Sequence, residues 1–599
     1  MQNTRKSSIR SLSFILALSL FLCSCSSGSV PNESTEPPGT PSDSVSDQEQ
    51  FEQIVDDLFY DTLTGSGLIM HSTLSDPEAY GFTEFPDTLG DYSLQGIQEN
   101  YADLNEDYEK LLTIDRKALP PELQTDYDIL TEYMETEQEG ESFCLYDYPL
   151  SSISGMQMEL PIILAEYRFR KQEDVDHYLA LLADIDECYT QLLDYIRQQT
   201  DSGIFLSDLT IDGIMDSCQV YLDSPETGMM AETFETRLDS LTELTEEERI
   251  SYLERNQEIL KNDFTNAYTL LTDGLEKLKG HLELPVGTSA LPDGKKYYEY
   301  LLKSSTFTSY KDPESLRNAI AENMQAELNR AYDLMEEYPE LSRDLYSFRS
   351  PIHDPAEALL DLQQKLTEDF PEIASCSYEI RMLPEALEDF SSPAFYLTPP
   401  VDTQNENFIY INRSSASAQN DLYTVMAHEG YPGHLYQCNY FNRKNDSRLR
   451  ALMNFSCYVE GWATYVQYLA YCWEEGASPE LAELLSINES VSLALYALVD
   501  YQVNYEGMTL EELKQFMEQV FGVGSPEDTL KLYQLVCEDP ANYMKYYVGY
   551  LEIRKMRETA EKLLGNKFSA KEFHTFLLDF GPAPFAVIRD RFADWLAVQ

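Results

Sequence analysis

Apolar residues recur every three or four positions through most of the chain, which is the pattern of amphipathic helices. Comparable stretches cover residues 245–280, 448–474, 478–521 and 540–565. A further helix is predicted from residue 312, where Asp312, Pro313 and Glu314 form a strong start signal. Between residues 175 and 199, one apolar stripe contains Tyr178, Leu181, Leu182, Ile185, Cys188, Leu192 and Ile196. The sequence therefore predicts a mainly α-helical body.

Strand-like segments are concentrated in one region. Residues 377–383, 394–400 and 407–415 are rich in Tyr, Ile and Phe and are separated by turn-forming residues. We expect them to form a small antiparallel β-sheet. Gly- and Pro-containing breaks fall at 282–294 and 391–406, and the first of these is the predicted boundary between two lobes.

The first fifty residues are predicted to export and tether the protein. A basic start and the apolar run Leu12–Leu22 form a signal peptide over residues 1–24. The run ends in Leu-Cys-Ser-Cys, which resembles a lipobox with Cys25 as the lipidated residue; an ordinary cleaved secretion signal is the alternative. Residues 25–50 are rich in Ser, Pro and Glu and are expected to be a disordered tether. The folded body is then expected to span 51–599.

Composition limits the classes of partner. With 43% hydrophobic and 12% aromatic residues, the body is globular, and its length of about 550 residues exceeds one ordinary core. The 105 acidic and 42 basic residues give a net charge of −63. Such a surface repels phosphates and anionic lipid, so we expect no nucleic acid partner and contact with the membrane only through the lipid anchor. The cysteines form no C-x-x-C pair, which argues against a cysteine zinc site.

The candidate chemistry lies in residues 427–437, AHEGYPGHLYQ. His428, Glu429 and His434 are residue types of a hydrolytic zinc site, but an H-E-x-x-H helix places its second histidine four residues after the first. In a straight helix, His434 would lie about 120° around and about 9 Å along the axis from His428. Pro432 interrupts the helix and Gly433 frees the backbone, so we predict a wide bulge that returns His434 to His428. A chance pair among the seven histidines is the alternative.

Glu460 is the third candidate ligand. It is the only acidic residue in the apolar and aromatic stretch 454–473, and a buried carboxylate is costly unless it is paired or bound to a metal. Zinc peptidases of the H-E-x-x-H…E type take a glutamate ligand from a second helix, and a small sheet beside the H-E helix is part of their layout. The alternative is a salt bridge from Glu460 to Arg448 or Arg450.

These motifs resemble a bacterial family known as domain of unknown function 885, many of whose members are lipoproteins. The family pattern H-E-x-x-P-G-H, followed by E-G-W-A-x-Y, corresponds to His428–His434 and Glu460–Tyr465. Further segments resemble the family at residues 294–298, 540–549, 573–574 and 581–584. The family is similar to the helical zinc peptidases of the angiotensin-converting-enzyme and oligopeptidase type. This resemblance implies a zincin-like, two-lobed α-helical body around a deep cleft.

Three positions depart from the family pattern. Leu435 follows the motif where the family often has histidine, Asn504 replaces the histidine of a D-x-G-x-H segment, and Asn542 replaces a glutamine. The candidate ligands are retained, so these departures concern substrate choice and catalytic rate.

Roles for the candidate residues follow from zinc chemistry. His428, His434 and Glu460 are expected to hold one zinc ion with a fourth position for water. Glu429 is expected to activate that metal-bound water as a general base. Tyr546 is our candidate donor to the oxyanion, with Tyr547 and His574 as alternatives. A packing role is the other interpretation of Tyr546, because the chain contains 42 tyrosines.

We therefore expect a zinc metallopeptidase that hydrolyses small oligopeptides at the cell surface, lipid-anchored to the bacterial cell membrane or envelope. Two alternatives remain open. One is a non-catalytic envelope lipoprotein that binds peptide or carbohydrate in the same cleft. The other is a hydrolase built on paired carboxylates, in which His428 and His434 are structural. The sequence has no G-x-S-x-G elbow and no P-loop, which argues against a serine hydrolase or a nucleotide enzyme.

Overall fold

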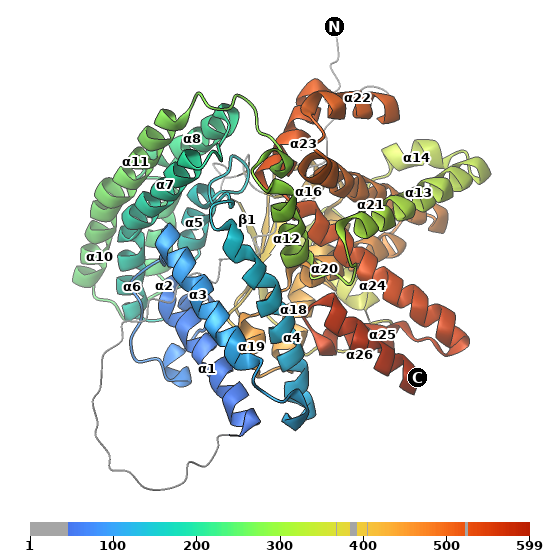
Figure 1. Ribbon diagram of the computed structural model, residues 1–599, viewed down its shortest axis with the longest axis horizontal. Coiled ribbons are helices and arrows are strands. Elements are labelled where there is room, and N and C mark those ends of the chain that lie inside the picture. Colours follow the sequence, from blue (N-terminus) through green and yellow to red (C-terminus); the bar gives the residue numbers. More distant parts are fainter. Residues whose placement is uncertain (1–45, 367, 384–387, 389–391, 404, 522–524) are drawn as a thin grey trace.

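The computed structural model of the protein describes residues 46–599 except 367, 384–387, 389–391, 404 and 522–524. The described chain is mainly helical, as the periodicity predicts, with a small sheet (Figure 1). The helices of its first half are α1 (Asp47–Gly65), α2 (Gly67–Thr73), α3 (Leu94–Leu111), α4 (Pro121–Gln138), α5 (Met156–Ala165), α6 (Gln172–Ala183), α7 (Ile185–Asp201), α8 (Asp208–Leu222), α9 (Met229–Leu238), α10 (Glu246–Ile259), α11 (Thr265–Leu275), α12 (Gly294–Thr306), α13 (Pro313–Glu337), α14 (Leu341–Ser347) and α15 (Pro355–Lys365). Those of the second half are α16 (Ala416–Asn420), α17 (Leu422–Glu429), α18 (His434–Asn442), α19 (Arg448–Leu452), α20 (Ser456–Ala470), α21 (Pro479–Tyr501), α22 (Leu510–Phe521), α23 (Pro526–Glu538), α24 (Asn542–Leu564), α25 (Ala570–Phe580) and α26 (Phe585–Val598).

Two large hydrophobic clusters form most of the core. The first is built mainly by α5–α11, which lie on the left in Figure 1. The second is built by α1, α3 and α4 together with the helices from α12 onward and the sheet. The chain passes from the first cluster to the second between Leu275 and Tyr298, an interval that contains the boundary predicted at 282–294. The two-lobed arrangement around a deep cleft stays a prediction.

The helix signals in the sequence are largely confirmed. Helix α13 begins where predicted, and the Asp312 carboxylate accepts a hydrogen bond from the Ser315 N–H at 2.7 Å. The apolar stripe of residues 175–199 is buried but belongs to two helices, α6 and α7. The break falls at Asp184, whose carboxylate accepts hydrogen bonds from Thr88 and Leu89. Periodicity does not reveal this break because the apolar stripe continues across it.

The folded body begins earlier than residue 51. Helix α1 starts at Asp47, so the last residues of the predicted tether are helical. The Ser46 hydroxyl accepts from the Glu49 N–H at 3.2 Å, and the Glu49 carboxylate accepts from the Ser46 N–H at 2.9 Å. This S-x-x-E capping box fixes the start of the helix. The signal peptide, Cys25 and the rest of the tether lie outside the described residues.

The predicted sheet is present, but it is mixed instead of antiparallel. Strands β1 (Tyr378–Met382), β2 (Ala394–Leu397) and β3 (Asn407–Ile411) lie in the order β1-β3-β2. Strand β3 is parallel to β1 and antiparallel to β2. The prediction assumes that strands consecutive in sequence pair as hairpins, whereas β3 lies between the other two and runs parallel to β1. In that central position β3 is more completely buried than β1.

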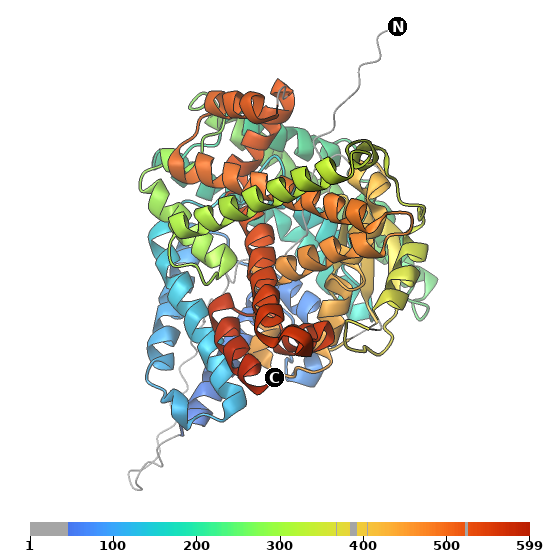
Figure 2. The ribbon, with the colours of Figure 1, turned by 90° about the vertical axis from the view of Figure 1, so that its right-hand side faces the viewer.

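Helix α21 and the π-helical segment Gln502–Glu506 that continues it are together long and apolar enough to cross a membrane by length and composition alone. Half of the apolar window is buried inside the protein. The helix packs against α24, α14 and α13, and α13 is the long yellow-green helix on the near side of Figure 2. This packing is typical of a core helix whose apolar residues contact neighbouring helices.

Candidate metal centre

The two histidines of the motif lie on separate helices. Helix α17 ends at Glu429, α18 begins at His434, and residues 430–433 form a turn between them. Gly433 permits the close approach within this turn, because a Cβ atom there would lie 1.8 Å from the His428 carbonyl oxygen. The expected interruption of the helix is therefore present, but as a tight turn between two helices instead of a bulge within one.

Contacts from outside the motif hold this turn. The Trp462 indole N–H donates to the Pro432 carbonyl at 2.8 Å, and Trp462 is fully buried on α20. Within the turn, the Tyr436 N–H donates to the Gly430 carbonyl at 3.1 Å. The sequence does not show that an anchor on a different helix fixes the turn, which explains why the predicted bulge was wrong in detail.

Helix α20 reaches the motif by crossing α24 at very short range. A Cβ atom on Gly461 would lie 2.4 Å from the backbone of Gly549, and one on Gly549 would lie 1.9 Å from the Cys457 carbonyl oxygen. Only glycine at these positions allows the two backbones to approach so closely. Glu460 precedes Gly461 directly, so this crossing sets the position of its carboxylate beside α17.

The structure brings His428, His434 and Glu460 together. Glu460 Oε2 lies 3.6 Å from His428 Nε2 and 3.5 Å from His434 Nε2, and one ligand atom from each residue lies within 4.8 Å of the others. All three side chains are buried. None of these three ligand atoms has a hydrogen-bond partner among the described residues.

The spacing and the donor types fit a zinc ion. Ligand atoms at about 2.0–2.2 Å from a tetrahedral zinc ion lie about 3.3–3.6 Å from one another. The separations of the Glu460 oxygen from the two imidazole nitrogens agree with this value. Two histidines and one carboxylate form a donor set of catalytic zinc sites, which leave a fourth position open.

The alternative salt bridge of Glu460 is absent from the described residues. Arg448 pairs instead with Asp56 at 2.7 Å. Arg450 donates to the Phe580 and Pro582 carbonyls, both at 2.7 Å. Neither guanidinium group neutralises the Glu460 carboxylate, whose nearest ionisable neighbours are the two histidines.

Burial and neighbouring groups shift the pKa values of the two glutamates and the two histidines of the centre in different directions. Burial raises the pKa of Glu429 to about 8. Burial also acts to raise the pKa of Glu460, but the adjacent His434 and His428 outweigh it and lower that pKa to about 2. Burial lowers the pKa of His434, whereas the contacts of His428 with Glu460 and Glu429 outweigh burial and raise its pKa. Glu460 is therefore an anion, while Glu429 retains a proton near neutral pH.

Two contacts around the centre were not foreseen from the sequence. Gln467, two turns beyond Glu460 on α20, places its Oε1 atom 2.9 Å from His428 Nδ1. The backbone of Tyr396 on β2 lies close to the Glu429 carboxyl and acts to lower its pKa, against the effect of burial. The spacing of seven residues from Glu460 is the one sequence signal that would have indicated Gln467, because it places both residues on one face of a helix.

The candidate oxyanion donors have different surroundings. Tyr546 is buried on α24, with the Lys545 ammonium 5.7 Å from its ring centroid. The Tyr547 hydroxyl accepts from Asn323 at 2.8 Å. His574 donates through Nδ1 to a backbone carbonyl and accepts at Nε2 from the Tyr465 hydroxyl, and burial lowers its pKa to about 3. His574 is thus a neutral histidine with both ring nitrogens engaged.

The departures from the family pattern have structural roles here. Asn504 accepts from the Thr288 N–H at 2.9 Å and donates to Asp500 and to the Val536 carbonyl. It therefore ties the end of α21 to α23 and to the segment before α12. Leu435 is fully buried in the hydrophobic core directly after His434.

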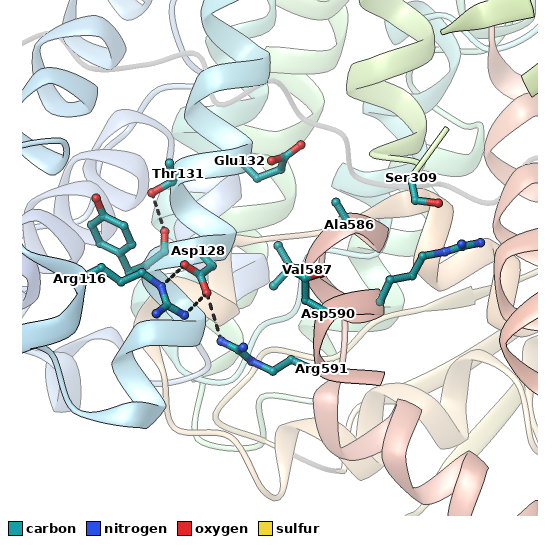
Figure 3. A pocket seen from close by; sticks show the side chains of 11 residues that line it. Arg116, Asp128, Thr131, Glu132, Ser309, Ala586, Val587, Asp590 and Arg591 are labelled. Atoms are coloured by element: carbon teal, nitrogen blue, oxygen red, sulfur yellow. Dashed lines mark hydrogen bonds and ion pairs between the residues drawn. The ribbon is translucent and has the colours of Figure 1, made fainter. Parts of the chain in front are cut away.

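A cavity of about 700 Å³ lies away from these residues, between α4 and α26 (Figure 3). Its lining contains none of the predicted site residues. Arg116 and Arg591 both pair with Asp128, as Figure 3 shows, and Arg589 pairs with Glu552. The cationic groups of this cavity are already neutralised, so it is not a candidate anion site.

The chain is similar to two solved structures over nearly its full length. A protein of Colwellia psychrerythraea described as a "putative lipoprotein" has a TM-score of 0.80 at 18% identity, covering 92% of this chain and 100% of that one. A "putative lipoprotein of unknown function" from Shewanella oneidensis has a TM-score of 0.63 at 16% identity, with the same shares covered. These likenesses show a common fold.

A search of curated proteins finds no significant match. Residues 77–592 match the family described as "Bacterial protein of unknown function (DUF885)". The match includes the broken histidine motif, the E-G-W helix and the C-terminal helices that pack on it. Because it extends over most of the chain, this protein belongs to the DUF885 family.

Proposed function

We propose that this protein is a zinc-dependent hydrolase of peptide bonds. The observation that carries the proposal is the convergence of His428, His434 and Glu460, whose buried ligand atoms lack hydrogen-bond partners among the described residues. Each buried polar group left without a partner costs about 1–3 kcal/mol. Three such groups around one point therefore favour a function that uses them together, and their spacing agrees with a tetrahedral ion.

The surrounding residues supply the proton transfers. A zinc ion held by these three residues would supply a Lewis acid for the scissile carbonyl and would lower the pKa of a water molecule. Glu429 lies outside the ligand group and next to His428. The positive charge of that ion would lower the pKa of Glu429, so that its ionised carboxylate would accept the proton of the attacking water and pass it to the leaving amine. Tyr546 is the proposed donor to the oxyanion.

The motifs favour a peptide as the substrate. The broken histidine motif and the E-G-W-A-x-Y segment that follows it resemble the helical zinc peptidases, whose substrates are peptides. The sheet beside the centre supports the same layout, because Tyr396 of β2 lies against Glu429.

We also propose that lipid on Cys25 anchors the enzyme outside the cytoplasm, at the bacterial cell membrane or envelope. The first 25 residues support this location, because they combine a basic start, an apolar run and a lipobox-like end. The two solved relatives are both described as lipoproteins. The net charge of −63 argues against a nucleic acid partner.

Peptide hydrolysis and metal content, measured on the same samples, test the proposal. Purified protein is incubated with zinc and a mixed peptide library, and the products are identified by mass spectrometry. Glu429→Gln should retain the metal and lose hydrolysis, whereas His434→Ala should lose both. His281→Ala is the matched control, because His281 is exposed and stacks on Phe205 far along the chain from the motif; it should retain both.

Two outcomes would contradict the proposal. Zinc bound at the site without cleavage of any peptide would favour a non-catalytic binding protein. Cleavage that persists in His434→Ala and in metal-depleted protein would favour a hydrolase built on carboxylates.

A further inference from the structure

Helix α20 contributes a second polar side chain to the centre. Gln467 follows Glu460 by seven residues, which is close to two full turns, so both side chains lie on the same face of the helix. The Gln467 Oε1 atom lies 2.9 Å from His428 Nδ1. One helix therefore contacts His428 on both of its ring nitrogens, with Glu460 facing Nε2 and Gln467 facing Nδ1.

The direction of this hydrogen bond decides which nitrogen of His428 is free. When the amide oxygen accepts from Nδ1–H, the Nε2 lone pair is directed into the centre. In the reverse case the amide donates to Nδ1, and Nε2 carries a hydrogen that must find an acceptor. The nearest carboxylate oxygen, on Glu460, is 3.6 Å from Nε2, which is longer than an N–H···O hydrogen bond of about 2.7–3.2 Å. The observed spacing agrees with the first arrangement.

We propose that Gln467 is a positioning residue that holds His428 in the tautomer protonated at Nδ1. Through this uncharged acceptor it also sets the zinc affinity of the centre below the value that a carboxylate at the same position would give. This effect on zinc affinity rests on the proposed function. A carboxylate in contact with the outer nitrogen raises the basicity of a histidine ligand, and an amide orients the ring without adding that charge. The amide also leaves Glu460 and Glu429 as the only carboxyls that the described structure places against His428.

Two substitutions separate orientation from charge. Gln467→Leu removes the acceptor and keeps the approximate size, whereas Gln467→Glu keeps an acceptor and adds a negative charge. Gln199→Leu is the matched control, because Gln199 is a buried amide in the other hydrophobic cluster, where it donates to the Leu145 and Asp147 carbonyls. The control should lower stability without changing the metal centre.

The tautomer is measured first, on metal-free full-length protein labelled with 15N-histidine. The His428 signal is assigned by its loss in His428→Ala. We expect the Nδ1–H form in the wild-type protein and in Gln467→Glu, and a shift of the population toward Nε2–H in Gln467→Leu. An Nε2–H tautomer in the wild-type protein, or an unchanged tautomer in Gln467→Leu, would overturn the positioning role.

Zinc affinity is then measured by competition with a chelator. Gln467→Leu should bind zinc about 10–100-fold more weakly than the wild-type protein, and Gln467→Glu should bind more tightly. Equal affinities of all three proteins would overturn the tuning role while leaving the proposed function intact. No zinc binding by the wild-type protein would contradict the proposed function, whereas the tautomer experiment would still decide the role of Gln467.

Discussion

Glu429 and Glu460 are buried in the same centre and have pKa values displaced in opposite directions. Burial keeps a proton on Glu429, whereas the two histidines keep Glu460 ionised. Carboxyls whose pKa values are separated in this way take different roles, one in proton transfer and one as a fixed charge. At the scale of single residues, this difference is the basis for assigning Glu460 to the metal and Glu429 to the water.

The role of Tyr546 is the most specific prediction at this scale. Tyr546→Phe should lower kcat by about 10²-fold or more, because it removes one donor to the developing oxyanion. Steady-state kinetics on a cleaved peptide, together with circular dichroism to check the fold, measure the effect. Tyr547→Phe is the matched control on the same helix, since the Tyr547 hydroxyl accepts a hydrogen bond from Asn323 on α13, and it should retain kcat. Equal turnover of Tyr546→Phe and the wild-type protein would assign Tyr546 to packing.

Helix α20 organises the centre at the scale of elements. It supplies Glu460, crosses α24 at Gly461, anchors the turn through Trp462 and contacts His428 through Gln467. Each function falls at a separate position along the helix. The positions of the candidate metal ligands are therefore fixed mainly by contacts between elements that are distant in sequence.

Local signals explain what the sequence could predict. A lone acid in an apolar stretch identified Glu460, and Pro432 with Gly433 indicated the helix break, because both effects act within a few residues. The form of the turn depends on Trp462, which is thirty residues away. The break at Asp184 likewise depends on Thr88 and Leu89, and the sheet order depends on which strand is buried centrally. Periodicity carries no information about such distant partners.

The crossing of α20 and α24 gives a prediction at the scale of elements. Gly549→Ala places a Cβ atom 1.9 Å from the Cys457 carbonyl oxygen, so the helices must separate. We expect a loss of at least about 1–3 kcal/mol in the free energy of unfolding, measured by chemical denaturation. Thr559→Ala, at an exposed position on the same helix, is the control and should be close to neutral. An unchanged stability of Gly549→Ala would contradict the close crossing.

The whole molecule is strongly acidic, and several of its carboxyls are buried or partly buried. Burial raises the pKa of Glu137, Asp147, Glu159 and Asp500 to about 7, compared with ordinary values of 4.5 for Glu and 3.8 for Asp. Between these values the folded protein holds protons that the unfolded chain releases. The contribution of these groups to the free energy of unfolding therefore has its full value below pH about 4 and is lost as the pH rises through about 7.

We expect the free energy of unfolding to increase as the pH is lowered from about 8 to about 6.5. Buried His71 and His574 have lowered pKa values and oppose this gain only below their ordinary pKa of 6.5. Denaturant unfolding at several pH values measures the slope. Asp500→Asn should reduce the slope of the unfolding free energy with pH, because that variant has no proton to release at this position. A stability that is constant or decreases over this interval would contradict the protonation of the buried carboxyls.

The lipid anchor is also a property of the whole molecule. Metabolic labelling with a fatty-acid analogue should mark the wild-type protein, and Cys25→Ser should abolish the label because the acceptor thiol is absent. The control is Cys23→Ser, since Cys23 follows the bulky Leu22 and fits the lipobox less well. Label that persists in Cys25→Ser would contradict the proposed anchor.

The most direct test of the central claim is an anomalous difference map of crystals grown with zinc, recorded at the zinc absorption edge. The account predicts one peak at about 2.0–2.2 Å from His428 Nε2, His434 Nε2 and a Glu460 carboxylate oxygen, with Glu429 outside the ligand shell. It would be contradicted by the absence of a peak at this point together with a direct hydrogen bond between Glu460 and either histidine, because the three residues would then satisfy one another without a metal.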